Sequence, residues 1–164
     1  MNQRLAILRA EADDIDAIWE MLEPVIRAGE SYSLPLDSSR EAGLAYWFAN
    51  GHDVFVAKLD GELVGSYFIQ PNQRGGGAHV ANCAYLTSSH SLGRGIGRSM
   101  CLHSLEFARA QAYRAMQFNF VLSTNERAVR LWQSCGFETV GRLPEAYLHP
   151  TAGYVDVFVM YQTL

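Results

Sequence analysis

The sequence predicts an α/β (α+β) domain in which a mixed, mostly antiparallel sheet of about six to seven strands is flanked by about four helices. Asp60-Gly61 between two apolar runs indicates an antiparallel hairpin. The strand–helix–strand pattern over 79–123 instead indicates a parallel pair with a right-handed crossover. The 164 residues fit one domain, spanning 1–164.

The first half of the chain reads as a strand, two helices and a hairpin. Residues 4–10 alternate as a strand, and Asp13 is the expected N-cap of a helix that Pro24 weakens or kinks late. That helix has apolar residues at helical spacing: Ile15, Ile18, Trp19, Leu22, Val25 and Ile26. After a loop over 28–37, Ser38 and Glu41 form a capping-box pattern, which opens a helix to about Asn50 with Gly51 as its stop.

The second half alternates strands with helices. Asp60-Gly61 joins strands 53–59 and 62–70, and a glycine-rich turn leads to a strand over 79–86. The elements that follow are a helix over 95–111, a strand over 115–123, a helix over 125–135 closed by Gly136, and strands over 137–143 and 153–161. The helix over 95–111 is expected to bury an apolar set of Ile96, Met100, Leu102, Leu105 and Phe107.

Composition excludes several classes of partner. The net charge of −4 argues against a nucleic-acid-binding protein built on a basic face. No apolar run approaches the roughly 20 residues of a membrane helix, so we expect no membrane partner. Cys83, Cys101 and Cys135 are scattered and odd in number, which favours buried, reduced thiols in a cytoplasmic protein over a disulfide framework or a metal site.

The stretch SLGRGIGRSM, residues 91–100, places three glycines immediately before a helix. Such a turn leaves main-chain N–H groups unpaired at the positive end of the helix dipole, which makes an anion site suited to a pyrophosphate. Arg94 and Arg98 would add positive charge around it. A nucleotide-binding loop of the Gly-Lys-Ser/Thr type is excluded, because Arg98-Ser99 follows Gly97. The glycines alone are equally compatible with a turn that only packs the helix on the sheet.

Two motifs together give a family resemblance. LGRGIG (92–97) between a strand and a helix, followed by NERAVRLWQSCGF (125–137), resembles the GNAT N-acetyltransferases over the whole chain. The resemblance implies acetyl transfer from acetyl-CoA by direct attack of an amine, without a metal. By the same resemblance the acetyl-CoA site comprises Leu86, Thr87, Leu92, Gly93, Arg94, Gly95, Ile96, Gly97, Arg98, Asn125 and Trp132.

The sequence departs from the family pattern at two of these positions. Leu92 stands where Gln or Arg is usual, so one side-chain contact to phosphate is absent. Trp132 stands where many members have a tyrosine that protonates the leaving thiolate. An indole N–H is a hydrogen-bond donor but not a usable acid, so that role is not carried over to this chain.

Few residues qualify for the remaining catalytic and substrate-binding roles. The strand over 79–86 has no carboxylate, which leaves Glu30 as a base, directly or through water, or His79; each is otherwise an ordinary surface group. Asn82 and Asn119 lie on strands, where Asn is depleted, and with Asn125 their spacing resembles a branch containing a yeast enzyme that acetylates proline analogues such as azetidine-2-carboxylate. The alternative for these amides is structural hydrogen bonding across splayed strands. The candidate catalytic residues are Asn82, Asn119 and Glu30, and the candidate substrate-binding residues are Glu30, Tyr32, Asn82, Asn119 and Tyr154, with Tyr85, His149 and Asp156 as further pocket or mouth residues.

The function predicted from these observations is that of a cytoplasmic, acetyl-CoA-dependent N-acetyltransferase. Its acceptor would be a small-molecule amine, an amino acid or an analogue, and the enzyme could form a homodimer. The alternatives are acetylation of a protein or peptide amine, and a non-catalytic acyl-CoA-binding module, because fold alone does not fix function.

Overall fold

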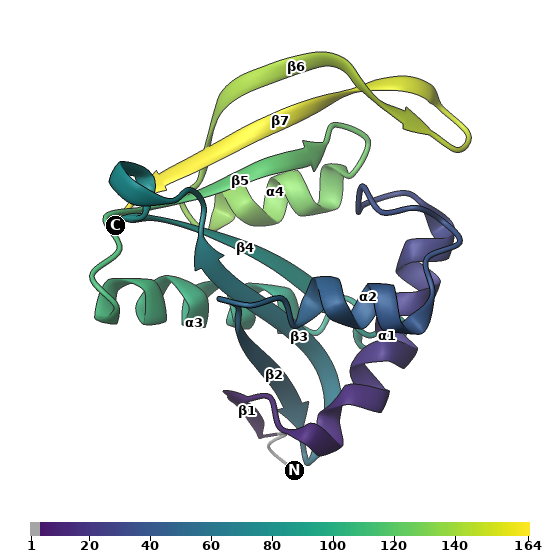
Figure 1. Cartoon of the computed structure of the whole chain (residues 1–164), viewed down its shortest axis with the longest axis vertical. Coiled ribbons are helices and arrows are strands. Elements are labelled where there is room, and N and C mark those ends of the chain that lie inside the picture. Colours follow the sequence, from purple (N-terminus) through teal and green to yellow (C-terminus); the bar gives the residue numbers. More distant parts are fainter. Residues whose placement is uncertain (1–3) are drawn as a thin grey trace.

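A seven-stranded mixed sheet runs through the molecule in the order β1-β2-β3-β4-β5-β7-β6. The computed structural model describes residues 4–164. All neighbouring strands are antiparallel except β4 and β5, which confirms the predicted fold class (Figure 1). The strands are β1 (Leu5–Arg9), β2 (Asp53–Leu59), β3 (Glu62–Pro71), β4 (Val80–Thr87), β5 (Ala115–Leu122), β6 (Glu138–His149) and β7 (Gly153–Thr163).

Helices cover both faces of the sheet and create two apolar cores. They are α1 (Ile15–Ala28), α2 (Arg40–Trp47), α3 (Ile96–Ala110) and α4 (Glu126–Ser134), with short 3-10 turns η1 (Ala12–Asp14), η2 (Gly75–Gly77) and η3 (Ser89–Ser91). One core contains Met100 of α3 with Tyr67 and Phe118, and the other contains Leu22 of α1 with Trp47. Leu102 was expected in the first core but is 45% exposed, because it lies on the solvent face of α3.

Helix boundaries differ from the predictions where more than one polar residue could serve as a cap. Asp13 lies inside η1, and the N-cap position of α1 falls to Asp14. The cap of α2 is Ser39, whose hydroxyl accepts from the Ala42 N–H, and not Ser38. That helix ends at Trp47 before Gly51 is reached, whereas α1 continues past Pro24 to Ala28.

The last two strands are longer than predicted. Their pairing slips between Leu143 and Tyr147, and Glu145 there has a φ of 49°. This irregularity breaks the alternation on which a sequence-based strand assignment depends, although pairing resumes beyond it up to His149 and Gly153. The Asp60-Gly61 hairpin is as predicted, with φ angles of 50° and 90° that match a type I′ turn.

The feature that positions the site is the divergence of β4 from β5. The two strands pair only at Val80–Ala115 and Ala81–Met116, and then separate (Figure 1). Just past the last pair, the Asn82 amide donates to the carbonyl of Gln117 over 2.9 Å. The pairing of β5 with β7 is irregular between Phe118 and Val121, which places Asn119 in a bulge beside the gap.

Two further observations concern the described residues 4–164. None of their helices is both long and apolar enough to cross a membrane. Nor do they bring together three or more His, Cys, Asp or Glu side chains in a way that could hold a metal ion.

Candidate active site

A cavity of about 490 Å³ lies where β4 and β5 separate. Its floor is the second half of β4, and its far wall comes from β5 and α4. Its remaining wall comes from α1, α2 and the loop between them, through Val25, Ser31, Tyr32, Ser33, Leu34 and Tyr46. The cavity is therefore assembled from segments that are far apart in the sequence, between Val25 and Trp132.

The glycine-rich turn before α3 meets one end of this cavity, where Leu92 is a lining residue. Gly93 and Gly95 have φ angles of 81° and 78°, a conformation that L side chains rarely adopt, and a Cβ on either would meet open space. Gly97 is needed for a different reason, since its Cβ would lie 3.1 Å from Leu131 of α4. The turn thus holds α3 close to α4 and keeps the space in front of the helix N-terminus open.

The first turn of α3 supplies main-chain donors at this position. The Ser99 N–H makes the first helical bond, to the Gly95 carbonyl, so the N–H groups of Ile96, Gly97 and Arg98 have no partner within the helix. The Arg98 guanidinium does not join them. It donates to the carbonyl and hydroxyl of Ser134 at the end of α4, so the Arg98 side chain ties α3 to α4.

Trp132 and Asn125 place α4 against the cavity. The centroid of the Trp132 ring lies 4.8 Å from the ring centroid of Tyr85 and 5.0 Å from that of Phe118, within a packed aromatic group. Asn125 caps α4 by accepting from the Ala128 N–H over 3.2 Å. Asn125 does not lie on the strand that carries Asn119, because β5 ends at Leu122.

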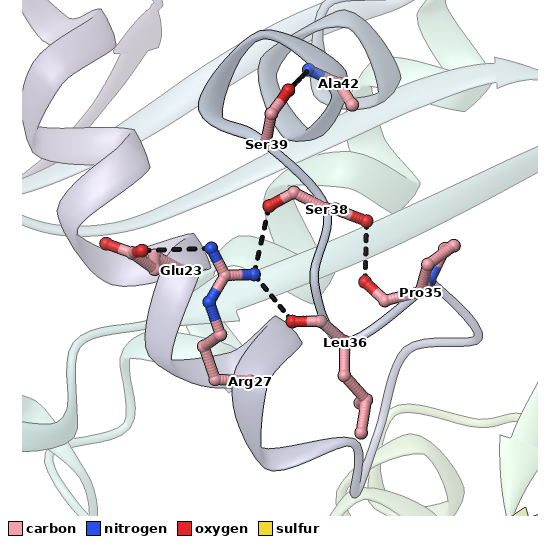
Figure 2. Close-up of polar contacts among 7 residues, drawn as sticks. All are labelled: Glu23, Arg27, Pro35, Leu36, Ser38, Ser39 and Ala42. Carbon is pink, nitrogen blue, oxygen red and sulfur yellow. Dashed lines mark hydrogen bonds and ion pairs between the residues drawn. The ribbon is translucent and has the colours of Figure 1, made fainter.

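The loop between α1 and α2 is fastened at two points. Arg27 of α1 donates to the carbonyls of Leu36 and Ser38 and pairs with Glu23, which fixes the end of the loop next to α2 (Figure 2). At the other end, the Tyr147 hydroxyl of β6 donates to the Gly29 carbonyl over 2.7 Å. Contacts from α1 and β6 therefore hold this loop over the cavity.

Tyr32 connects this loop to the floor of the cavity. Its hydroxyl donates to the main-chain carbonyl of Tyr85 on β4, and its ring packs edge-on against Trp47. The Tyr85 side chain points the other way, where its hydroxyl pairs with Ser104 of α3. Tyr32 therefore lines the cavity with its side chain, whereas Tyr85 contributes mainly its backbone.

Asn82 and Asn119 both line the cavity, as predicted, and both also have structural partners. Asn82 bridges the gap between β4 and β5 through its hydrogen bond to Gln117, which is the structural role that the sequence also allows. Asn119 accepts from the Gln117 amide over 2.8 Å and donates to Asn72 over 2.6 Å. Because a carboxamide has two N–H donors and an oxygen with two lone pairs, Asn119 keeps one N–H for a ligand.

Other predicted residues lie outside this cavity. Glu30 is exposed and lines a second cavity of about 430 Å³ with Ser31, Thr124, Asn125 and His149. Tyr154 is 68% exposed on β7 and lines neither cavity, because that part of the hairpin extends past the site. His79 is exposed before the start of β4, at the opposite end of the strand from the cavity. Asp156 pairs with Arg142.

Sequence reasoning missed several lining or supporting residues. Tyr46 and Phe120 line the cavity, and Tyr147 packs edge-on against Phe120 while it holds the loop. Tyr46 lies on a short helix with little amphipathic pattern, and Phe120 is brought to the cavity by a bulge. Phe120 continues the apolar alternation of Met116 and Phe118, so periodicity alone predicts a core position for it and not a place in the cavity wall.

The titratable groups of the lining are held in their neutral forms. Burial raises the pKa of the Tyr32, Tyr46 and Tyr85 phenols above the ordinary value. Burial likewise raises the pKa of the Cys83 thiol to about 12. None of these four groups is positioned to act as a base at neutral pH.

Comparison with known proteins identifies the family. Residues 15–137 match the model of the acetyltransferase (GNAT) family. A solved GCN5-related N-acetyltransferase from Kribbella flavida is 38% identical to this chain, with 98% of each chain covered and a TM-score of 0.93. N-acetyltransferase aca1 of Schizosaccharomyces pombe is 27% identical over 151 residues, which cover 82% of this chain and 72% of aca1.

A more distant structure has the same fold. The yncA protein of Salmonella typhimurium, solved with its cofactor acetyl-CoA, is 20% identical, with a TM-score of 0.85 over 98% of this chain and 94% of its own. The fold and the site thus define an acyl-transferring class of enzyme. The chain belongs to the GNAT family and is an N-acetyltransferase.

Proposed function

We propose that this chain, as one domain over residues 1–164, transfers the acetyl group of acetyl-CoA to the nitrogen of a small-molecule amine. The observation that carries the proposal is the meeting of three features: the glycine-rich turn before α3, the open edge of β4 and the 490 Å³ cavity. The turn supplies anion donors, the strand edge supplies a track of main-chain groups, and the cavity supplies room for an acceptor.

The residues present fit acetyl-CoA. Open space in front of Gly93 and Gly95, with the N–H groups of the first turn of α3, suits a pyrophosphate. When bound, acetyl-CoA supplies the acetyl group as a thioester. The acetyl-CoA in the Salmonella yncA structure supports this reading, although that relative shares only 20% identity.

The open edge of β4 offers donors for a thioester carbonyl. The Val80 carbonyl accepts from Asn72 on the β3 side, whereas the Tyr85 carbonyl accepts from Tyr32 on the open side. Because the main-chain groups of a strand alternate between its two edges, the N–H of Tyr85 lies on the open side with its carbonyl. We assign this N–H as the donor that stabilises negative charge developing on the carbonyl oxygen.

The polar groups of the acceptor side are amides. Asn119, with one N–H remaining, and Asn82 are placed to hold a polar group of the acceptor, with Tyr32 as a wall. Trp132 presents an indole instead of a phenol, so we assign no acid there; a thiolate leaving group does not require one. Roles for Glu30 and Tyr154, a cytoplasmic location and a homodimer stay predictions.

The direct test is to mix the protein with acetyl-CoA and a panel of amines and to measure the release of free thiol. Turnover with small amines that exceeds the rate with peptides is the expected result. Preference for a peptide would favour the protein-acetylating alternative. Tight binding of acetyl-CoA without turnover would favour the non-catalytic module, and failure to bind acetyl-CoA would overturn the proposal.

Asn119→Ala tests the acceptor assignment. We expect kcat/KM for the acceptor to fall roughly tenfold, in line with loss of one hydrogen bond, while the Kd of acetyl-CoA changes less than twofold. Asn72→Ala is the matched control, because it removes a hydrogen-bond partner of Asn119 but keeps Asn119 itself. It should lower kcat/KM for the acceptor by less than Asn119→Ala does. Equal losses of acceptor and acetyl-CoA affinity in Asn119→Ala would move this residue to the cofactor site.

A further inference from the structure

The cavity is lined without any charged side chain. Among the described residues that form its walls there is no Asp, Glu, Lys, Arg or His. The walls are apolar on the acceptor side at Val25, Leu34 and Phe120, and the polar groups are hydroxyls and carboxamides. An acceptor bound here therefore meets no group of opposite charge.

The ionisable groups of the lining do not change this. They are the phenols of Tyr32, Tyr46 and Tyr85 and the thiol of Cys83, all kept neutral by burial. In the adjoining second cavity, which shares Ser31 and Asn125 with the first, the ionisable groups are Glu30 and His149.

His149 is oriented as a donor. Its Nδ1 accepts from the main-chain N–H groups of Thr151 and Ala152, each over 3.2 Å. The neutral ring then carries its proton on Nε2, so this nitrogen donates a hydrogen bond and does not take a proton from an amine. Among the described residues that line the two cavities, Glu30 is thus the one group that could serve as a base, and it is exposed in the second cavity.

These observations restrict the acceptor. Moving an ammonium group into a cavity without a counter-charge costs several kcal/mol, so an amine enters it as the neutral form. A carboxylate in the same place would also lack a cationic partner. Resting on the function proposed above, we propose that the acceptor is a weakly basic amine, neutral near pH 7, carried on an uncharged, partly apolar body. Its own low basicity then supplies the neutral nucleophile without a general base of the enzyme, and the proton that the nitrogen loses on acylation goes to the departing thiolate, directly or through water.

A matched pair of amines tests this proposal. 2-Phenylethylamine and 2,2-difluoro-2-phenylethylamine have nearly the same shape, but the fluorines lower the basicity of the nitrogen. At pH 7 we expect kcat/KM to be roughly tenfold higher for the fluorinated amine, because each pH unit below an amine's pKa lowers its neutral fraction tenfold. For each amine, kcat/KM should rise with pH up to that amine's own pKa.

Variants of Ser31, which lies between the two cavities, sharpen the test. Ser31→Asp adds a carboxylate and should reduce the preference for the fluorinated amine at least threefold. Ser31→Asn has nearly the same volume without the charge, and should leave the ratio of the two amines unchanged. An unaltered ratio in Ser31→Asp would contradict the proposal.

Glu30→Gln separates an enzyme base from the basicity of the acceptor. The proposal expects the inflections of the pH profiles to stay at the pKa of each amine in this variant. A single inflection common to both amines that disappears in Glu30→Gln would overturn it, as would a preference for free amino acids. Titration with acetyl-CoA alone separates failure of this inference from failure of the proposed function. Binding of acetyl-CoA without an acceptor tests the proposed function and does not depend on the basicity of the acceptor.

Discussion

The two halves of the active site are built in different ways. The half for which we propose acetyl-CoA binding, the acetyl-CoA half, consists of β4, the glycine-rich turn and the first turn of α3, which are continuous in the chain from Val80 onward. The half for which we propose acceptor binding, the acceptor half, combines the α1–α2 loop with a bulge in β5 and with Tyr147 of β6, and the Tyr147–Gly29 contact joins residues 118 positions apart. The first half depends on local backbone geometry, and the second on contacts between distant segments.

This difference predicts which groups matter for binding in each half. In the acetyl-CoA half, the main chain provides the donors, so the essential side chains are those that are absent, at Gly93 and Gly95. In the acceptor half, side chains do this work: Tyr32 forms part of the wall, and Tyr147 holds the loop that carries it. Variants in each half test whether the two can be weakened separately.

Gly95→Glu should abolish measurable binding of acetyl-CoA, with at least a 100-fold rise in Kd by titration calorimetry. The new carboxylate would occupy the open space before α3, repel phosphate and strain a φ of 78°. Gly61→Glu is the matched control, because Gly61 has a φ of 90°, open space at its Cβ and a place in the distant β2–β3 hairpin. Unchanged affinity in Gly95→Glu would show that the turn is not the phosphate site.

Tyr147→Phe should raise the acceptor KM about three- to tenfold, which corresponds to the loss of one hydrogen bond to the loop. The Kd of acetyl-CoA should stay within twofold, because Tyr147 touches only the acceptor half. Tyr113→Phe, at a tyrosine that lines neither cavity, is the matched control and should change neither constant. If Tyr147→Phe weakened acetyl-CoA and acceptor equally, the separation between the halves would be lost.

Arg27→Met should raise the acceptor KM about twofold. It removes the contacts that fix the loop near Leu36 and Ser38, but the Arg27 side chain is 41% exposed and such contacts are individually weak (Figure 2). Steady-state kinetics at varied acceptor concentration measure this KM. Arg40→Met, which breaks an exposed ion pair with Asp16, is the control. An effect in Arg40→Met as large as that in Arg27→Met would contradict a role for loop fixation.

Asp14→Asn should mainly change the dependence of stability on pH. Burial works to raise the pKa of Asp14, but Lys58, 2.8 Å away, and the Glu11 N–H together lower it below its ordinary value. The carboxylate therefore stabilises the fold above the unfolded-state pKa of about 3.9, and this contribution is lost as the pH falls through the lower folded-state pKa.

Thermal unfolding between pH 6 and pH 2 measures the effect. The wild type should lose Tm more steeply on the acid side than Asp14→Asn, whose amide still accepts from Glu11. Asp16→Asn, at a largely exposed carboxylate, should follow the wild-type curve. Parallel curves for the wild type and Asp14→Asn would show that the Asp14–Lys58 pair does not anchor the start of α1 to β2.

Much of the fold could be predicted from local patterns. The Asp60-Gly61 hairpin and the order of strands and helices follow from turn chemistry and periodicity, which act over a few residues. Errors arose where neighbouring polar residues compete, as for Ser38 and Ser39 at the start of α2. They also arose where pairing is irregular, as near Glu145 in β6.

In the site, too, features set by local sequence were predictable and features set by packing were not. LGRGIG predicted an open turn before α3, and the positive φ angles of Gly93 and Gly95 confirm the conformational reason for it. The sequence could not show that the Arg98 side chain turns to Ser134, since that depends on how α3 packs against α4. Nor could it place Glu30 outside the main cavity or bring Tyr147 to Gly29.

The GNAT family, the parallel pair in the sheet and the open glycine turn before α3 could thus be predicted from the sequence. These are consequences of short-range rules: where glycine is required, where a helix begins and where a strand alternates. The uncharged lining of the 490 Å³ cavity could be seen only in the tertiary structure, because that lining comes from α1, α2, β4, β5 and α4 at once. Whether two distant residues share a wall is fixed by packing, and packing is a property of the whole chain.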